Sequence, residues 1–133
     1  MMKTRYILLL SVLVFILSSC DHDAHITVTN EVSNVRIEKI SYGDISLNNQ
    51  ALLPGETSAK KTIVDKWDNV KFPMHERLQF YMVSGTNKVF LMTKETYKLD
   101  EDQTLNIIIN NDTEVVNPAS SEKSSIVKIC EIK

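Results

Sequence analysis

Residues 78–93 read LQFYMV, SGTN and KVFLMT in succession, and this stretch decides the fold. The two outer runs are rich in aromatic and β-branched residues, which favour strands. The four residues between them include Gly85, which is typical of a tight turn. Both runs are apolar on both faces in places, as strands in the middle of a packed sheet are. We therefore predict a central β-hairpin over residues 78–93.

Alternation of apolar and polar residues predicts further strands on both sides of this hairpin. The clearest alternation is ITVT at residues 26–29. Over residues 35–42 the alternation slips by one position at Lys39-Ile40, which predicts a β-bulge. The remaining expected strands cover residues 45–47, 57–64, 104–110 and 126–132.

Turn-forming residues separate these runs. Pro54-Gly55 suits the centre of a type II turn, because proline fixes φ and glycine accepts a positive φ. Pro73 argues against a central strand at its position, since it cannot donate to a ladder. Residues 62–71 are the only place where we expect a helical turn, and residues 111–125 are predicted to be a polar loop.

The number and spacing of these strands predict an all-β fold. We expect an antiparallel β-sandwich, immunoglobulin-like or transthyretin-like, with a small barrel as the alternative. Trp67 is not flanked by a pair of cysteines, which excludes the cysteine–tryptophan–cysteine core of antibody domains.

The first residues have the pattern of an export signal. Lys3 and Arg5 precede the run ILLLSVLVFIL at residues 7–17, in which Ser11 is the only polar residue. As a helix this run would rise about 16 Å. The hydrocarbon core of a bilayer is about 30 Å thick, so the run fits a signal peptide better than a membrane span. We expect a signal helix here.

The next residues, Leu17-Ser18-Ser19-Cys20, resemble the lipobox of bacterial lipoproteins. The resemblance implies cleavage between Ser19 and Cys20, a diacylglyceryl group on the Cys20 thiol, and acylation of the new amino group with a fatty acid such as palmitate. Two or three acyl chains would hold the protein stably in a membrane. An ordinary secretory leader with a chance cysteine and an uncleaved anchor are the alternatives.

The expected organisation is a lipoprotein signal peptide over 1–19, a lipidated tether over 20–24 and a single β-sandwich domain over 25–133. The full chain has a net charge of −2, and the leader contributes only basic residues, so the mature chain is more acidic. This excludes a nucleic-acid partner, which would need a basic face. Cys130 would have no partner once Cys20 is acylated, and we expect a buried or half-buried thiol there.

A second resemblance concerns the whole arrangement. A lipobox followed by a small all-β domain with a Leu-Pro-Gly-Glu-Thr-Ser turn, residues 53–58, is similar to the small, uncharacterised lipoproteins of Bacteroides-type bacteria. Acidic residues after the cysteine, here Asp21 and Asp23, resemble a surface-export signal of that group. The resemblance implies a cell-envelope protein on the outer membrane, facing either the periplasm or the surface.

Few residues of the chain could bind a metal ion or act in catalysis. His22 and His25 lie near Asp21 and Asp23, but their spacing is not that of a closed metal site, and we expect no metal and no cofactor. His75 is next to Glu76 but no nucleophile motif accompanies them, so we expect a surface histidine and no catalytic residues.

Aromatic residues are the better functional candidates. Trp67 lies in a polar, loop-like stretch, and with Tyr42 it could form a binding surface for an envelope protein or a glycan. The alternative is that the aromatic residues fill the core. We therefore predict a non-enzymatic lipoprotein with a binding or structural β-domain. A small envelope hydrolase, or an accessory subunit or inhibitor of an exported enzyme, is the alternative; a hydrolase would need a cleft that holds His75 and Glu76 beside a hydroxyl.

Overall fold

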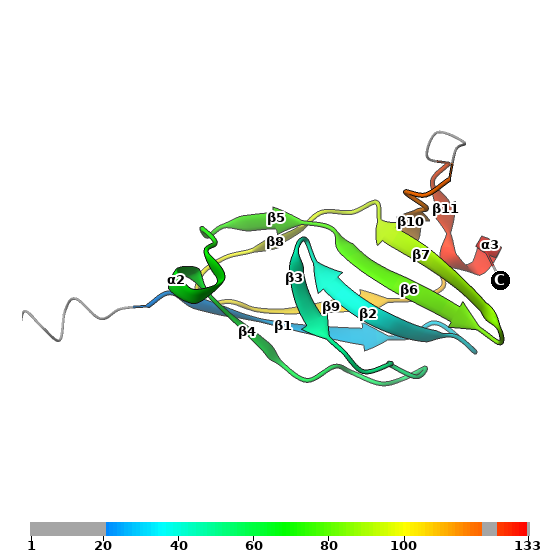
Figure 1. Ribbon diagram of the computed structural model, residues 1–133, viewed down its shortest axis with the longest axis horizontal. Coiled ribbons are helices and arrows are strands. Elements are labelled where there is room, and N and C mark those ends of the chain that lie inside the picture. The colour runs from blue at the N-terminus through cyan, green and yellow to red at the C-terminus, as the bar shows by residue number, and fades with distance from the viewer. Residues whose placement is uncertain (1–20, 121–124, 133) are drawn as a thin grey trace, which may run out of the picture.

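The computed structural model describes residues 21–120 and 125–132. The expected signal helix, the cleavage site at Ser19 and the lipidation site at Cys20 lie outside these residues. Within them the chain forms two β-sheets that face each other across one core, so the all-β sandwich is confirmed (Figure 1).

The larger sheet has six strands in the order β11-β10-β7-β6-β2-β3, and all neighbours are antiparallel. Its centre is the predicted hairpin, which pairs from Gln79 with Met92 to Ser84 with Asn87. The strands of this sheet are β2 (Arg36–Tyr42), β3 (Ile45–Asn48), β6 (Leu78–Ser84), β7 (Asn87–Thr93), β10 (Glu114–Val116) and β11 (Val127–Lys128).

The smaller sheet has three strands in the order β4-β1-β9. They are β1 (Asp23–Asn30), β4 (Lys61–Val64) and β9 (Thr104–Ile109). β1 is antiparallel to β4 but parallel to β9, so the expectation of a purely antiparallel sandwich is wrong for this pair. Parallel neighbours need a long crossover, and here four strands of the larger sheet, β2, β3, β6 and β7, lie between β1 and β9 in the chain.

The start of β1 also corrects the expected tether. β1 begins at Asp23, and Ala24 is fully buried, so the folded domain starts two residues earlier than predicted.

A short two-stranded sheet continues the central hairpin beyond its base. It pairs β5 (Met74–Glu76) with β8 (Tyr97–Leu99). The Tyr42 hydroxyl group lies 2.7 Å from the carbonyl oxygen of Tyr97 and 3.2 Å from that of Met74, and it can donate to either. Tyr42 therefore fixes both short strands to β2.

The chain changes sheets between β3 and β4. Leu52 exchanges two backbone hydrogen bonds with Ile37 of β2, and Ser58 then donates its N–H to the carbonyl group of Val28 in β1. The predicted strand over 57–64 is accordingly shorter than expected, because its first half is this crossing segment and only an isolated bridge joins Thr57 to Thr29.

Three local predictions are confirmed. Glu56 donates its N–H to the Leu53 carbonyl group around Pro54-Gly55, and Gly55 has φ 87°, as a type II turn requires. The pairing of β2 with β6 shifts register between Glu38 and Ser41, and Lys39 has φ 50°, so the bulge is real. The helical turn expected within residues 62–71 is α2 (Asp65–Asp68).

The C-terminal prediction is wrong in part. Only Val127–Lys128 of the expected strand over 126–132 pairs as a strand, and α3 (Ile129–Ile132) follows it. The N–H groups of Ile129 and Cys130 bond to the carbonyl groups of Thr113 and Asn111, which draws the chain out of the ladder. Ile129 enters the core, whereas Cys130 is exposed and free, so the expected burial of its thiol is also wrong.

The core is built from alternate residues of both sheets. Burial alternates along the whole of β1, as a strand with one buried face requires. The largest fully buried side chains are Tyr42, Phe80, Ile26, Ile37, Ile40, Ile63, Leu78, Leu91, Leu99, Ile107, Ile109 and Ile129. Among the described residues, no buried side-chain nitrogen or oxygen lacks a hydrogen bond.

Candidate functional site

Two adjoining clefts follow the side of the sandwich where β3 and β4 lie, and we call them together the edge groove. The first has a volume of about 620 Å³ and the second about 540 Å³. They share Ser46 and Lys61, which makes the groove continuous. The first cleft is lined by residues 46–52, 56–59 and Lys61, and the second by residues 44–46, Lys61, residues 67–70, Met74 and Glu76.

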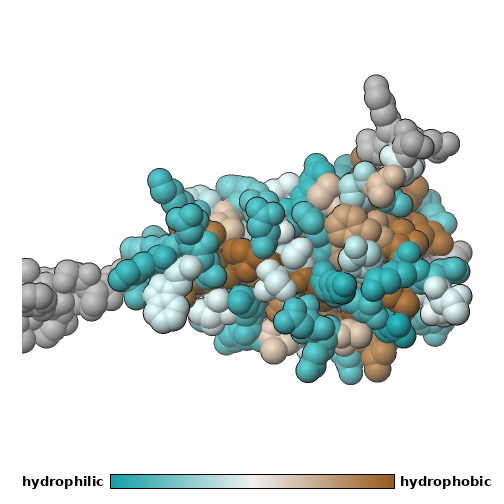
Figure 2. Space-filling view, viewed as in Figure 1, coloured by the Kyte–Doolittle hydropathy of each residue, from teal (hydrophilic) through white to brown (hydrophobic). Residues whose placement is uncertain are grey.

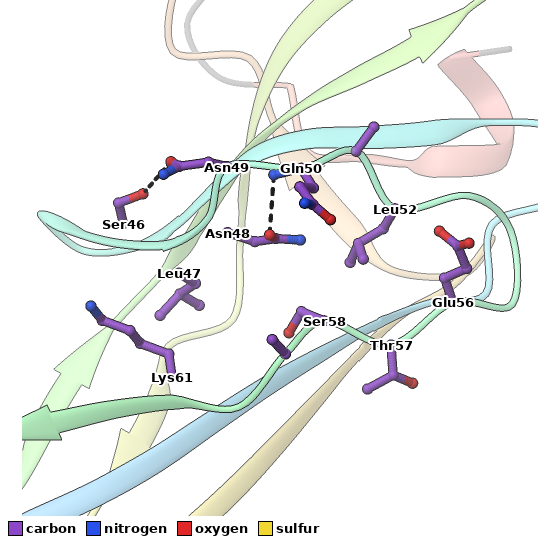
Figure 3. A pocket seen from close by; sticks show the side chains of 12 residues that line it. Ser46, Leu47, Asn48, Asn49, Gln50, Leu52, Glu56, Thr57, Ser58 and Lys61 are labelled. Carbon is purple, nitrogen blue, oxygen red and sulfur yellow. Dashed lines mark hydrogen bonds between the residues drawn. The ribbon is translucent and has the colours of Figure 1, made fainter.

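The first cleft has polar walls and an apolar floor. Figure 3 shows Leu47 and Leu52 pointing into the space between the chain after β3 and the chain before β4. Asn48 accepts a hydrogen bond from the Gln50 N–H group (3.1 Å), which shapes the loop after β3 (Figure 3). The side chains of Gln50 and Lys61 form no hydrogen bond or ion pair with any described residue. The cleft thus retains free hydrogen-bonding capacity above an apolar base.

The second cleft lies between α2 and β5. Glu76 reaches into it across Gly43, where an added Cβ atom would be 2.8–2.9 Å from three Glu76 side-chain atoms. Gly43 also has φ 56°, so any other residue there would both collide with Glu76 and strain the backbone. Trp67 of α2 stands at the far end of the cleft with 81% of its surface exposed.

The groove is bordered by two edge strands. β3 ends the six-stranded sheet and β4 ends the three-stranded sheet. An edge strand presents unpaired backbone N–H and C=O groups along its outer side. These groups can accept an extended peptide as an additional strand, with alternate side chains entering neighbouring pockets.

The structure separates the two aromatic residues that sequence reasoning proposed for a binding surface. Trp67 is exposed, as a binding residue must be. Tyr42 is fully buried, and burial raises the pKa of its hydroxyl group to about 12. Its inclusion in a binding surface is therefore wrong; it is a core residue whose hydroxyl group joins three strands.

The histidines do not form a catalytic arrangement. The side chain of His75 is exposed on β5 and makes no hydrogen bond or ion pair with a described residue, whereas its neighbour Glu76 lines the groove. Neighbouring residues of a strand point to opposite faces, so the two do not act together. His25 contacts the Thr62 hydroxyl group at 3.0 Å, and His22 pairs with Glu101 at 2.7 Å. Over residues 21–120 and 125–132, no three metal-ligating side chains come together.

Asn30 is an important residue that sequence reasoning missed. It is fully buried and donates from Nδ2 to the carbonyl oxygens of Val35 and Leu52, both at 2.9 Å, while its Oδ1 accepts from the Val32 N–H group at 3.0 Å. These bonds hold the segment that forms one wall of the groove. The sequence did indicate this role, because Asn30 continues the series of alternate positions, starting at Ile26, whose side chains point into the core.

Comparison of the chain with protein-family models, with curated proteins and with solved structures gave no match. In the described part of the chain, no helix has the length and apolar character needed to cross a membrane. Function therefore has to be inferred from the residues and their geometry.

Proposed function

We propose that this protein is a lipid-anchored cell-envelope protein whose β-sandwich binds a partner protein by an extended segment in the edge groove. The observation that carries the anchoring is the position of β1, which begins at Asp23, three positions after Cys20. The lipobox pattern at residues 17–20 and the start of the folded domain are independent features, and they fall at adjacent places in the chain.

The binding role is supported by the form of the groove. Two edge strands border it, and amide, hydroxyl and amino groups line it above Leu47 and Leu52. Backbone groups of β3 or β4 can pair with a peptide chain, which favours a protein partner over a glycan. The outer membrane is the proposed location, on the resemblance to Bacteroides-type lipoproteins, with the domain facing either the periplasm or the surface.

The enzymatic alternative gains no support from the arrangement of the groove. A hydrolase of the kind considered needs a histidine beside a hydroxyl group and a carboxylate. The groove holds Ser46 and Glu76, but His75 does not line it.

Anchoring is tested by comparing the two cysteines of the chain. We expect Cys20→Ser to abolish incorporation of labelled palmitate and to release the protein from membranes, because the acyl chains supply the attachment. Cys130→Ser is the matched control, since Cys130 is the other cysteine, and it should remain labelled and membrane-bound. Retention of the label after Cys20→Ser would refute the anchor.

Binding is tested by purifying the protein from its own membranes in mild detergent and identifying what co-purifies by mass spectrometry. We expect a stoichiometric protein that is lost with Asn48→Arg, because the larger side chain narrows the cleft. Asn87→Arg at the exposed start of β7 is the control and should retain the partner. A partner retained by both variants would exclude the groove, and the absence of any protein partner would favour a glycan.

A further inference from the structure

We propose that Trp67 enters the interfacial layer of the membrane that holds the lipid on Cys20, and thereby sets the orientation of the domain. This inference rests on the lipid anchor proposed above. It assigns Trp67 a lipid surface as its partner in place of the protein or glycan considered from the sequence.

First, backbone hydrogen bonds hold α2 next to the residues that follow Cys20. Asp23 of β1 pairs with Val64, the last residue of β4, and the Asp65 N–H group donates to the His22 carbonyl oxygen at 3.0 Å. Lys66 Nζ lies 4.0 Å from Asp21 Oδ1. Trp67 is the next residue, so it belongs to the end of the sandwich at which β1 begins (Figure 1).

The second step is the reach of the anchor. Asp23 lies three positions after Cys20, and an extended chain covers at most about 3.6 Å per position, which gives about 11 Å. The polar layers of a bilayer make up the difference between a core of about 30 Å and a total of about 40–45 Å. The end of the domain that carries α2 is therefore held at the depth of the headgroups or directly above them.

The third step is the chemistry of the side chain. Trp67 is the most exposed of the large exposed apolar residues of the described chain, at 81% against 52% for Leu53. Tryptophan is enriched at membrane interfaces, where its ring is buried among apolar groups and its N–H stays near water. One tryptophan would hold a free domain weakly, but a short tether makes its insertion an intramolecular event with a high effective concentration.

The charges around Trp67 set a condition on the lipid. Hydrophilic residues dominate this end of the molecule in Figure 2. Acidic side chains outnumber basic ones there, with Asp21, Asp65, Asp68, Glu101 and Asp102 against Lys61, Lys66 and Lys71. An anionic surface repels such a cluster over a Debye length. Insertion should therefore be strongest in zwitterionic lipid and weaken as anionic lipid is added.

The test uses the fact that Trp67 is the only tryptophan of the chain. The acylated protein is reconstituted into phosphatidylcholine vesicles, either plain or with bromine on the acyl chains near the headgroup. We expect the brominated vesicles to quench most of the Trp67 emission, and anionic lipid to restore part of it. Unchanged emission in the brominated vesicles would overturn the proposal.

A relocated tryptophan provides the control. Trp67→Phe combined with Thr86→Trp moves the single tryptophan to the exposed turn between β6 and β7, at the opposite end of the sandwich (Figure 1). Its emission should be equal in the two kinds of vesicle. Intact mass of the reconstituted protein separates the two proposals: acylated protein with unquenched Trp67 leaves the anchor standing and refutes the orientation, whereas protein without lipid refutes both.

Discussion

The two open sides of the sandwich differ in how their polar groups are used. The side bordered by β9 and β10 also has a cleft, of about 650 Å³, comparable in size to either part of the edge groove. There most of the charged side chains are paired: Lys94 pairs with Glu114 at 2.8 Å and Lys128 with Asp112 at 3.3 Å, and only Glu95 among the charged residues that line this cleft has no such partner among the described residues. In the edge groove the side chains of Gln50 and Lys61 have no such partners among the described residues.

The difference follows from how the chain passes from one sheet to the other. Between β9 and β10 it needs only a tight turn, in which Asn110 accepts from the Asp112 N–H group at 2.9 Å. Between β3 and β4 it takes a longer path that is held from inside by Asn30. The second path leaves an open space lined by side chains that have no partner among the described residues, and this feature, rather than volume, is the reason we propose the edge groove as the binding site.

The largest expected effect comes from removing the internal support of the groove. Asn30→Ala leaves the Val35 carbonyl group and the Val32 N–H group without their partner, while the Leu52 carbonyl group keeps its bond from the Ile37 N–H group. Each unsatisfied buried group costs about 1–3 kcal/mol, so we expect a loss of about 2–6 kcal/mol in the free energy of unfolding. Urea unfolding followed by circular dichroism in mild detergent measures this loss.

Asn110→Ala is the matched control on the opposite side of the sandwich. Asn110 is only partly buried, so water can replace its bonds and the loss should be about 1 kcal/mol or less. Equal losses for the two variants would contradict the claim that the two crossings are supported differently.

The next effect concerns the far wall of the groove. Ser58 Oγ accepts the Val28 N–H group at 2.9 Å, and Ser58→Ala removes this acceptor from a buried donor. We expect a loss of about 2 kcal/mol in the free energy of unfolding. Hydrogen exchange at the Val28 amide should become faster, and an unchanged exchange rate would show that the hydroxyl group does not support the wall.

A smaller effect, confined to high pH, is expected at the end of the groove near β5. Tyr42→Phe removes a hydroxyl group that bonds backbone carbonyls, which costs about 1 kcal/mol at neutral pH. Burial raises the pKa of Tyr42 from 10.0 to about 12, so the folded state holds this proton more tightly than the unfolded state. The resulting stability is complete below pH 10 and is lost as the pH rises towards 12.

The wild type should therefore lose more stability than Tyr42→Phe between pH 10 and 12. Urea unfolding of both proteins across this range measures the difference. Burial also raises the pKa of Tyr97, but that residue is present in both proteins and its contribution cancels. Parallel stability curves would contradict the role given to Tyr42.

The smallest effect is expected at the ion pairs of the opposite side. Their side chains are about half exposed or more, and exposed pairs contribute less than about 1 kcal/mol each. Lys94→Met combined with Lys128→Met should thus change the free energy of unfolding little, and high salt should reduce even this difference. We also expect binding to be unchanged in this variant. Glu114 and Asp112 lose their ion-pair partners, but the partner protein should still bind in the edge groove and not in this cleft.

Local patterns predicted the parts of the fold that local interactions decide. The hairpin over 78–93, the turn at Gly55 and the bulge at Lys39 each depend on a few neighbouring residues. The parallel pairing of β1 with β9 joins Thr27 to Asn106, which are 79 positions apart, and alternation carries no information on such a partner. The α3 turn was missed for the same reason, because its direction depends on contacts with Thr113 and Asn111.

The candidate site was predicted only in its exposed part. Trp67 was identified because a tryptophan in a polar stretch is unusual, and its exposure agrees with that reasoning. The groove itself was not predicted, since it exists only because the segment around Leu52 and Ser58 changes sheets. Asn30 could have been found, as a polar residue in a buried phase of β1 needs internal partners.

The place of β1 in the smaller sheet also sets the order in which the chain can fold. β1 is made first, yet its parallel partner lies 79 positions later, at Asn106. At synthesis rates of about 5–20 residues per second, the partner is made roughly 4–16 s after β1. β1, the middle strand of this sheet, therefore lacks one of its two neighbours until β9 has been synthesised. For the exported protein proposed above, this delay would help to keep the chain unfolded while it passes a translocation pore.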